Sequence, residues 1–445
     1  MTHRILRYAS SSAVIMIVAT ALHAQVPGAD TLRLTVDEAL SRATAASPEL
    51  ARERVEVERA RAERISAGAF FPELPELEYR QATDAPFADE GEGMWELGVA
   101  QEIELGGQST LRSEAADLAV AGSELRVRAA EVALRADVRA SFARVAAAEA
   151  RVRLFDSLAA FAHRLDAAAA RLLAAEEISE LERNAIRIER GRTDLELLRA
   201  TGELDAARAG LASMVRSDAG VIVSAVMPPL DTAGMRAQLI AIAGLEGRIV
   251  SGDTSLLHAR PEWQALELER RRADVQRRLA GRTAIPNVRL GLSLESETRP
   301  AVTGEAGTQT LETNRLLGFN VGVRIPLPLP GLYDVGAGDV ALAEAGMRIA
   351  TAEQLLLETR IRAELTRASA RLRPAVEALG IYAREIAPLV TRNLALLERG
   401  YRAGELSASE VIAQQQQFVR AGESLIEAQL EYAEALADLE RALGR

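Results

Sequence analysis

The sequence contains no cysteine among its 445 residues. Disulfide bonds, thiolate metal sites and a lipid anchor on cysteine are therefore excluded. It contains no lysine either, so that all 53 basic residues are arginine. Aromatic residues make up only 4% of the chain, which is little for the core of an ordinary globular domain. Alanine is abundant instead, and this composition favours long helices that pack closely.

Long apolar runs are also absent, except at the N-terminus. There, two arginines precede an apolar run over residues 9–21, and the letters LHAQ supply a cleavage point after Ala24. This pattern predicts a signal peptide at residues 1–24 and a mature protein that begins at Gln25. The run is too short for a membrane-spanning helix, and no later run approaches that length. We therefore expect an exported protein that is not an inner-membrane protein.

Motifs for catalysis and metal binding are missing as well. Beyond the signal peptide the chain keeps two histidines, His163 and His258, and neither stands in a pattern that would suggest a catalytic triad. The glycines of residues 331–338 follow a proline-broken strand and are typical of a turn rather than of a phosphate-binding loop. Clusters with metal-ligand spacing are absent. The sequence predicts no enzyme, no cofactor and no metal site, and the net charge of −11 argues against a nucleic-acid partner.

An internal repeat dominates the rest of the sequence. The stretch SPELARERVEVERARAE, which begins at Ser47, resembles RPEWQALELERRRADVQ, which begins at Arg260. Further matches follow at a similar offset. A repeat of this length implies two copies of one structural unit. We predict a first repeat within residues 25–216, a linker at residues 217–259 and a second repeat at residues 260–445.

Each repeat has the same predicted order of helix, strand, strand and helix. The helix opens at a proline, Pro48 or Pro261, which fits the first helical position. In the second copy the two strand-like runs are NVRLGLSLE and LLGFNVGVRI, in which apolar residues alternate with polar residues and glycine. That period of two predicts strands with one apolar face and one polar face. The first copy has a weaker version of this alternation around Leu77 and Leu97.

The helical stretches repeat their apolar residues every seven positions. One such series is Val411, Phe418, Leu425, Tyr432 and Leu439. A sustained period of seven is typical of helices that wind around their neighbours as in coiled coils. The stretch over residues 107–174 corresponds to a helix of roughly 100 Å. A rod of that length cannot bury its faces in one compact domain, so we expect partners along its whole length.

The strands need partners too. Alternating apolar and polar residues fit a wall between lipid and water, and an open sheet edge cannot lie in lipid. Two repeats supply only four strands, whereas single-chain membrane barrels have about eight or more. The barrel must therefore be shared between chains, and three chains would give twelve strands and a matching cylinder of helices. The alternative is a periplasmic coiled-coil spacer without a pore, which would have no use for strands with a lipid-facing side.

A signal peptide, two helix–strand–strand–helix repeats and two long helical hairpins together resemble the TolC family of outer-membrane efflux channels. The motifs QEIELGG (residues 101–107) and RIPLPLPG (residues 324–331) resemble in particular the branch for heavy-metal cations, the CzcC-like proteins. The resemblance covers almost the whole mature chain. Some members carry a lipid on an N-terminal cysteine, and this chain departs from them.

The resemblance implies a mainly α fold with a short β-barrel. Three copies would form a 12-stranded barrel in the outer membrane, joined to a long α-helical coiled-coil barrel in the periplasm. It also implies that this homotrimer is the passive exit duct of a tripartite efflux system. Its partners would be outer-membrane lipid, a periplasmic adaptor protein and an inner-membrane pump of the resistance-nodulation-division class. Heavy-metal cations are the expected cargo, and drugs, other organic molecules or type I secretion are the alternatives.

The stretch GYRAGELSASE interrupts the second helical hairpin, after more than sixty residues that read as one helix. Gly400 and Gly404 are of the type that ends a helix, and Ser407 with Glu410 has the spacing of a capping box that starts the next one. The first copy repeats this box, so both stretches predict hairpin tips, each with an exposed apolar residue. The tip residues are Glu177, Ile178 and Ser179 in the first copy and Gly404, Glu405, Leu406 and Ser407 in the second.

The resemblance assigns two roles to these tips. They would face the adaptor, so Ile178 and Leu406 are candidate contacts with it; the alternative is that both only staple the turns. Glu410 falls where family members commonly carry an aspartate of the acidic ring that narrows the periplasmic end of the tunnel, and Glu182 is its equivalent in the first copy. A second acidic position of the ring falls on Ala413, so the ring is at best partial. The alternative is that both glutamates serve only as helix caps.

Overall fold

The computed structural model describes residues 31–445, except for residues 70, 72, 85, 87–90, 217–221, 226–231, 283, 304–307, 325–336, 387, 390–395, 398, 402 and 404. The predicted signal peptide and its cleavage site between Ala24 and Gln25 lie outside the described residues. The same holds for Gly404 and for all but the first residue of the RIPLPLPG motif.

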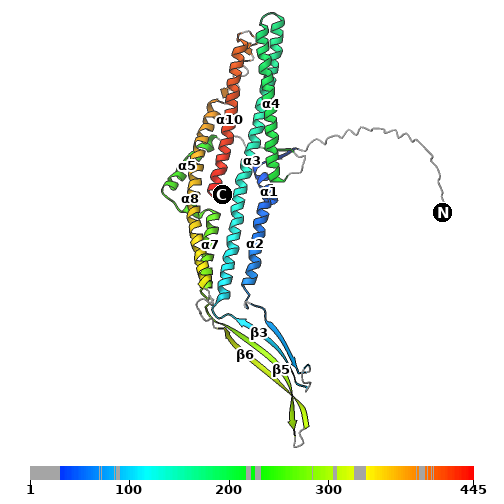
Figure 1. Ribbon diagram of the computed structural model, residues 1–445. Helices are drawn as coiled ribbons and strands as arrows, with labels where there is room; N and C mark the ends of the chain where they lie inside the picture. Colours follow the sequence, from blue (N-terminus) through cyan, green and yellow to red (C-terminus); the bar gives the residue numbers. More distant parts are fainter. Residues whose placement is uncertain are drawn as a thin grey trace, which may run out of the picture.

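The helices form a long rod, and a four-stranded sheet extends from one end of it (Figure 1). The longest helix, α3, runs over Gln108–Ala174 and has 67 residues, close to the roughly 100 Å expected from the sequence. Helix α4 (Glu180–Val215) returns beside the half of α3 that is farther from the sheet, and α2 (Pro48–Ala67) lies beside the other half. The end of the rod where α3 turns into α4 is called the tip.

The second repeat supplies a similar set of helices. Helix α7 (Pro261–Ala280) lies next to α8 (Ala337–Ile381), and α10 (Ala408–Ala442) returns from the tip (Figure 1). In each repeat, the helix that lies in the half of the rod nearer the sheet, α2 or α7, begins at a proline. The order helix, strand, strand, helix recurs in the two halves of the chain. Among the described residues, no helix combines the length and the apolar character that are needed to cross a membrane.

The helix that leads to the second tip differs from the expectation. The sequence predicted one helix of more than sixty residues, but α8 has 45 and passes at Tyr382–Ile386 into a π-helix, η1. The prediction of an unbroken helix was wrong. Proline has no N–H with which to continue the ladder of hydrogen bonds. Pro374 lies inside α8 and Pro388 follows η1 closely, so the irregular turn forms where helical bonding is already weakened.

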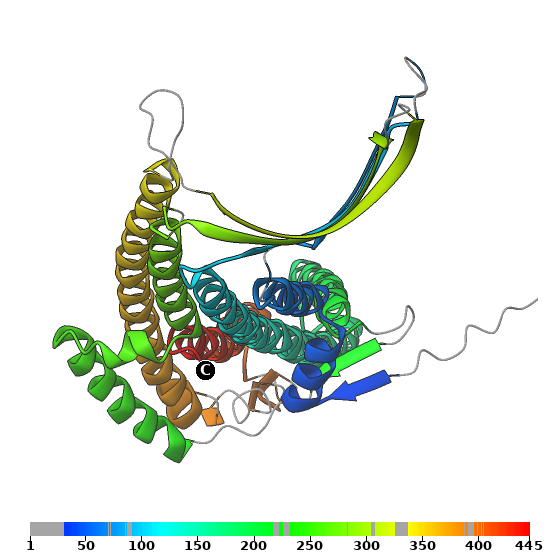
Figure 2. The same cartoon turned by 90° about the horizontal axis from the view of Figure 1, so that it is seen from below.

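A smaller layer of elements surrounds the middle of the rod. Strands β1 (Thr31–Leu34) and β4 (Ile222–Ala225) pair in parallel, and helix α1 (Val36–Ala46) follows β1. The region expected to be a linker also contains helices α5 (Thr232–Val250) and α6 (Ser255–His258). Helix α5 lies against α8, and its buried apolar residues belong to the same core (Figure 2). None of these elements was anticipated from the sequence.

The sheet is formed by strands from both repeats. Strands β2 (Glu76–Thr83) and β3 (Gly93–Ile103) come from the first, and β5 (Asn287–Thr303) and β6 (Thr308–Arg324) come from the second. All neighbours are antiparallel in the order β2–β3–β5–β6, so β2 and β6 are the edges. The sheet is curved when seen from below, along the rod (Figure 2).

Apolar contacts hold the rod together in three main zones. One packs α3 and α4 against β1, β4 and α1. A second joins α5, α6 and α7 to α8 and α10. The third lies at the tip and includes residues of both hairpins. Alanine occurs in all three, which allows the helices to approach closely, and the third zone positions the tip residues.

Candidate functional site

The first hairpin tip lies between α3 and α4. Helix α3 ends where Glu176 adopts a positive φ of 60° and the N–H of Glu177 donates to the carbonyl of Leu172 at 2.9 Å. This is the hydrogen bond of a Schellman motif, in which the left-handed residue is usually glycine. The turn ends at Ser179, whose extended backbone caps α4. Because glutamate is not typical of the left-handed position, the sequence did not mark the end of α3.

The second tip contains the same backbone hydrogen bond. The N–H of Glu405 donates to the carbonyl of Gly400 at 2.9 Å, at the same two positions of the repeat. Gly404, which corresponds to Glu176 in the first tip, lies outside the described residues. Gly400 is itself helical, so the prediction that it ends the helix was wrong.

Both glutamates that are expected to narrow the channel are bound in capping boxes. Oε2 of Glu410 accepts from the backbone N–H of Ser407 at 2.8 Å, and the N–H of Glu410 donates to Oγ of Ser407 at 3.3 Å. Glu182 and Ser179 repeat the pattern at 3.0 and 3.2 Å, which confirms both predicted boxes. The backbone and side-chain hydrogen bonds from Ser407 hold the pKa of the Glu410 carboxyl below its usual value. That carboxylate is therefore charged at neutral pH.

The tip cluster, the apolar zone at the end of the rod, joins the two hairpins. Its buried members are Phe161, Leu165, Ala168, Ala169, Ile186, Leu397, Tyr401, Ala408, Val411 and Phe418. Tyr401 is only 3% exposed, and its hydroxyl has no hydrogen-bond partner among the described residues. Burial raises the pKa of Tyr401, and the charge of Glu182 in the other hairpin adds to this. The two tips thus form one packed unit.

The two apolar tip residues are half-buried rather than exposed. Ile178 and Leu406 both pack against the tip cluster. A Cβ on residue 400 would lie 2.8 Å from Cδ1 of Leu406. Because Gly400 has no side chain, Leu406 can pack against the helix at this point. The prediction that both residues are exposed was wrong, and their packing fits the alternative in which they staple the turns. Their contact with a partner stays a prediction.

Polar side chains are buried between the helices below the tip cluster. Gln415 of α10 is fully buried, and its Nε2 donates to Oγ1 of Thr193 in α4 at 3.4 Å. Asp166 of α3 is held by two arginines of α4, Arg183 and, at 2.7 Å, Arg190. Buried polar groups are satisfied in only one alignment of the helices. The bond from Gln415 to Thr193 therefore aligns the two hairpins, whereas the ion pairs of Asp166 align α3 with α4 inside the first one; the sequence analysis missed both.

One face of the sheet is apolar across all four strands. One row of facing residues consists of Leu77, Val99, Leu292 and Phe319. The next row consists of Tyr79, Leu97, Leu294 and Leu317. All eight side chains are exposed. The opposite face carries charged residues and glycine, for example the row of Glu78, Gly98, Ser293 and Gly318. The alternation predicted from the sequence is confirmed, and it leaves an apolar wall that no described residue covers.

Two helices carry exposed apolar stripes that the sequence analysis did not single out. The stripe on α4 consists of Leu181, Ile188 and Leu195, and the stripe on α8 consists of Leu342, Ile349 and Leu356. Residues seven apart lie on one side of a helix, and Leu181 is 80% exposed. A period of seven was visible in the sequence. The period could not show which series of residues packs within the chain and which stays exposed, because both kinds of series repeat every seven residues.

The described residues contain no group of three or more histidine, aspartate or glutamate side chains that could hold a metal ion. The ring Nε2 of His163 lies 3.1 Å from Oδ1 of Asp194 on the surface, and the ring of His258 lies edge-on to that of Trp263.

Residues 254–445 match the model of the family described as outer membrane efflux protein. No curated protein sequence matches the chain. Among solved structures, CusC, described with its transmembrane channel formation, is 16% identical, with a TM-score of 0.70 over 92% of this chain and 91% of that one. The CmeC outer membrane channel of Campylobacter jejuni is 14% identical, with a TM-score of 0.68 over 92% and 85%. The MtrE outer membrane channel of Neisseria gonorrhoeae, in its open state, is 16% identical, with a TM-score of 0.66 over 92% and 88%.

These structural likenesses extend over the first repeat, which the family model does not reach. At such low identities they show the fold alone. Residues 254–445 thus match the outer membrane efflux protein family, and the chain as a whole has the fold of outer-membrane channels.

Proposed function

We propose that the chain is the outer-membrane exit duct of a tripartite efflux system, a passive channel that catalyses no reaction. Three copies would close a 12-stranded barrel in the outer membrane, and their helices would continue it as a tunnel through the periplasm. The main observation in support of the proposal is that one chain combines a sheet with an exposed apolar face and a helical rod of roughly 100 Å. A lipid-facing wall and a long tube are the two parts of such a duct.

The free edges of the sheet favour an assembly of several copies. Strands β2 and β6 have no strand beyond them among the described residues, and unpaired backbone groups are too costly to leave in lipid. Four strands are also too few for a barrel. The exposed stripes on α4 and α8 are the helical counterpart of these edges, because a second copy can cover apolar faces of this kind. A homotrimer would satisfy both needs.

The tip is the end of the rod that would meet the periplasmic adaptor and, through it, a pump of the resistance-nodulation-division class. The tip cluster packs Ile178 and Leu406 into one unit, so a partner would meet both hairpin turns together. In our proposal Glu182 and Glu410 line the periplasmic mouth. Carboxylates in a narrow opening focus negative potential and raise the local concentration of cations.

Heavy-metal cations are the proposed cargo. The motifs QEIELGG and RIPLPLPG and the acidic residues at the tip support this choice. Drugs or other organic molecules, or type I secretion, are the alternative use of the same duct. A periplasmic spacer without a pore is a weaker candidate, because a wall of exposed leucine and aromatic side chains would be unfavourable in water.

Two measurements test the proposal. The protein purified in detergent should have the mass of three chains, and in planar bilayers it should form channels of steady conductance. A monomeric mass without conductance would contradict the duct and favour the spacer. Cells that express the channel together with its adaptor and pump should gain resistance to divalent heavy-metal ions. Resistance to organic drugs alone would contradict heavy-metal cations as the cargo, but it would still support the proposed function as an efflux duct.

A further inference from the structure

Helix α7 ends in a strongly basic segment. Residues 270–282 contain six arginines and a single acid, Asp274, in a chain whose net charge is −11. The corresponding segment of the first repeat, residues 57–69, contains three arginines and two acids. The positive charge is therefore a property of the second repeat, and the helical repeat by itself does not require it.

The basic segment lies where the rod meets the sheet. A short connection leads from α7 to β5, and Nε2 of Gln108, at the start of α3, donates to the carbonyl of Arg282 at 3.2 Å. Val288, which faces Ile103 and Val323 on the apolar side of the sheet, follows only a few residues after Arg282. Arg270 lies about 15 Å before the end of the helix, at 1.5 Å per residue. When the apolar face of the sheet is in lipid, the end of this segment at Arg282 is next to the phospholipid head groups, and the rest of the segment extends from them along the rod.

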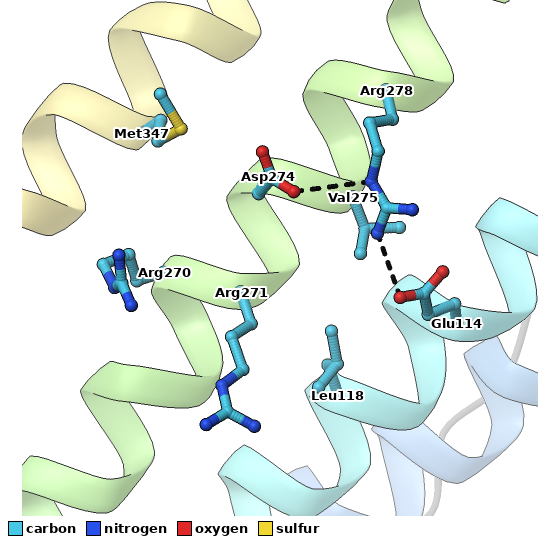
Figure 3. A pocket seen from close by; sticks show the side chains of 8 residues that line it. All are labelled: Glu114, Leu118, Arg270, Arg271, Asp274, Val275, Arg278 and Met347. Carbon is cyan, nitrogen blue, oxygen red and sulfur yellow. Dashed lines mark hydrogen bonds and ion pairs between the residues drawn. The ribbon is translucent and has the colours of Figure 1, made fainter.

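Ion pairs within the chain leave part of this charge uncompensated. Arg278 forms ion pairs with Asp274 at 3.4 Å and with Glu114 of α3 at 3.0 Å (Figure 3). Arg277 shares the same aspartate at 3.2 Å. Arg271 pairs with Glu267 at 2.6 Å, and Arg272 pairs with Glu269 at 3.4 Å. Arg270 and Arg282 are exposed and have no ion pair or side-chain hydrogen bond with any described residue. Two guanidinium groups of this segment, one at each end, are thus free to bind an external anion.

A cleft of about 400 Å³ lies along the same segment, between α3, α7 and α8. Arg270, Arg271 and Arg278 line it together with the two acids already bound by Arg278 (Figure 3). The remaining walls are apolar and consist of Leu118, Val275 and Met347. Guanidinium groups bind phosphate oxygens in a bidentate manner, and apolar walls accept the glycerol end of an acyl chain. The cleft therefore suits an anionic amphiphile.

We propose that residues 270–282 bind the phosphate groups of anionic phospholipids in the membrane that the sheet enters. The inference rests on the proposed function, because only a sheet in a membrane brings head groups to this level. Arg270 and Arg282 make the electrostatic contact, and the cleft holds the part of the lipid next to the phosphate. This contact fixes how far the rod stands out from the membrane surface.

The test compares matched arginine variants of the full chain in neutral detergent. Dioctanoyl phosphatidylglycerol or dioctanoyl phosphatidylcholine is titrated in, and binding is measured by native mass spectrometry. The test variant is Arg270→Gln with Arg282→Gln. The control is Arg187→Gln with Arg420→Gln, which removes two exposed arginines in the half of the rod near the tip that also lack ion pairs with described residues. We expect the unchanged protein and the control to prefer phosphatidylglycerol, and the test variant to bind it about tenfold more weakly, because each arginine near an anionic surface contributes separately.

Three outcomes would overturn the inference. They are an equal affinity of the unchanged protein for the two lipids, an equal loss in the control variant, and displacement of phosphatidylglycerol by inorganic phosphate at the same concentration. Conductance of the same preparation in phosphatidylcholine bilayers separates this inference from the proposed function. A protein that conducts without any preference for phosphatidylglycerol loses only the lipid site, whereas one that binds the lipid selectively and never conducts loses the proposed function.

Discussion

At the scale of single residues, the glutamates of the two tips combine a structural bond with a charge. Glutamine keeps the geometry of a capping box but removes the charge. We expect Glu410→Gln combined with Glu182→Gln to leave the thermal midpoint of the protein unchanged, while cation selectivity falls and block by multivalent cations weakens in planar bilayers. If selectivity and block stay the same at unchanged stability, these glutamates are caps only.

The lowered pKa of Glu410 also predicts that the N-terminal cap of α10 is less stable in acid. Its pKa is lowered in the folded protein, so the ionised carboxylate stabilises the cap above the ordinary pKa of glutamate, about 4.3, and this contribution is lost as the pH falls through the lowered value. The first turn of α10 should therefore open more often at about pH 3 than at about pH 7. Amide hydrogen exchange at residues 408–412, corrected for the intrinsic rate, measures this opening. The same acid response in Glu410→Gln would assign it to another group.

Gly400 offers a test of how the second tip is packed. An exposed helical glycine gains about 1 kcal/mol of stability when it is replaced by alanine. We expect this gain for Gly202→Ala on α4, which is exposed and where no atom lies within 4 Å of the added Cβ. Gly400→Ala should instead lower the thermal midpoint, because its Cβ would stand 2.8 Å from Cδ1 of Leu406. Adding Leu406→Ala should relieve the clash between these two side chains, and equal gains at both glycines would show that the turn is not packed as described.

The capping boxes of the tips could be predicted from the sequence, but the exposure of the tip side chains could not. A capping box depends on two residues three positions apart, so Ser179 with Glu182 was recognisable without any structure. Whether Ile178 is exposed depends on the tip cluster, whose members come from segments that are far apart in the sequence. The left-handed Glu176 had no signal, because the residue type usually found there is glycine.

At the scale of helices and strands, the exposed stripes on α4 and α8 predict where copies of the chain meet. A charge placed on an apolar contact must be desolvated on assembly. We expect Ile188→Asp and Ile349→Asp each to reduce the fraction of trimer in detergent, measured by mass, without changing helix content in circular dichroism. The control is Arg187→Asp, which introduces a charge on a neighbouring side of α4. Trimers that survive both isoleucine changes would show that these stripes are not the contacts between copies.

Long elements were easier to predict than short ones. Helix α3 could be foreseen over nearly its whole length, because seven-residue spacing over 67 residues outweighs any local exception. Strands β1 and β4 have four residues each and pair across almost the whole first repeat, so no periodic pattern marks them. The break after Ile381 was also missed, because proline is tolerated at Pro374 inside α8 and no local rule separates that position from Pro388.

At the scale of the whole molecule, the signal peptide stays a prediction from the sequence. We expect export to remove residues 1–24, so that the mature protein begins at Gln25. Intact mass spectrometry of protein purified from outer membranes measures this directly. Retention of Met1 would contradict the predicted cleavage, and a different first residue would move the cleavage site.

The pairing of β1 with β4 has a consequence for the order in which the chain assembles. These strands join the two ends of the first repeat, so its helices can pack together as soon as the chain has been synthesised as far as Ala225. Its strands cannot do so, because β3 needs β5 as its neighbour and β5 arrives with the second repeat. Until then, β2 and β3 have an apolar face uncovered and an edge unpaired, which is a state prone to aggregation. The edge of β3 is paired once β5 is present, whereas the apolar face stays exposed even in the complete four-stranded sheet.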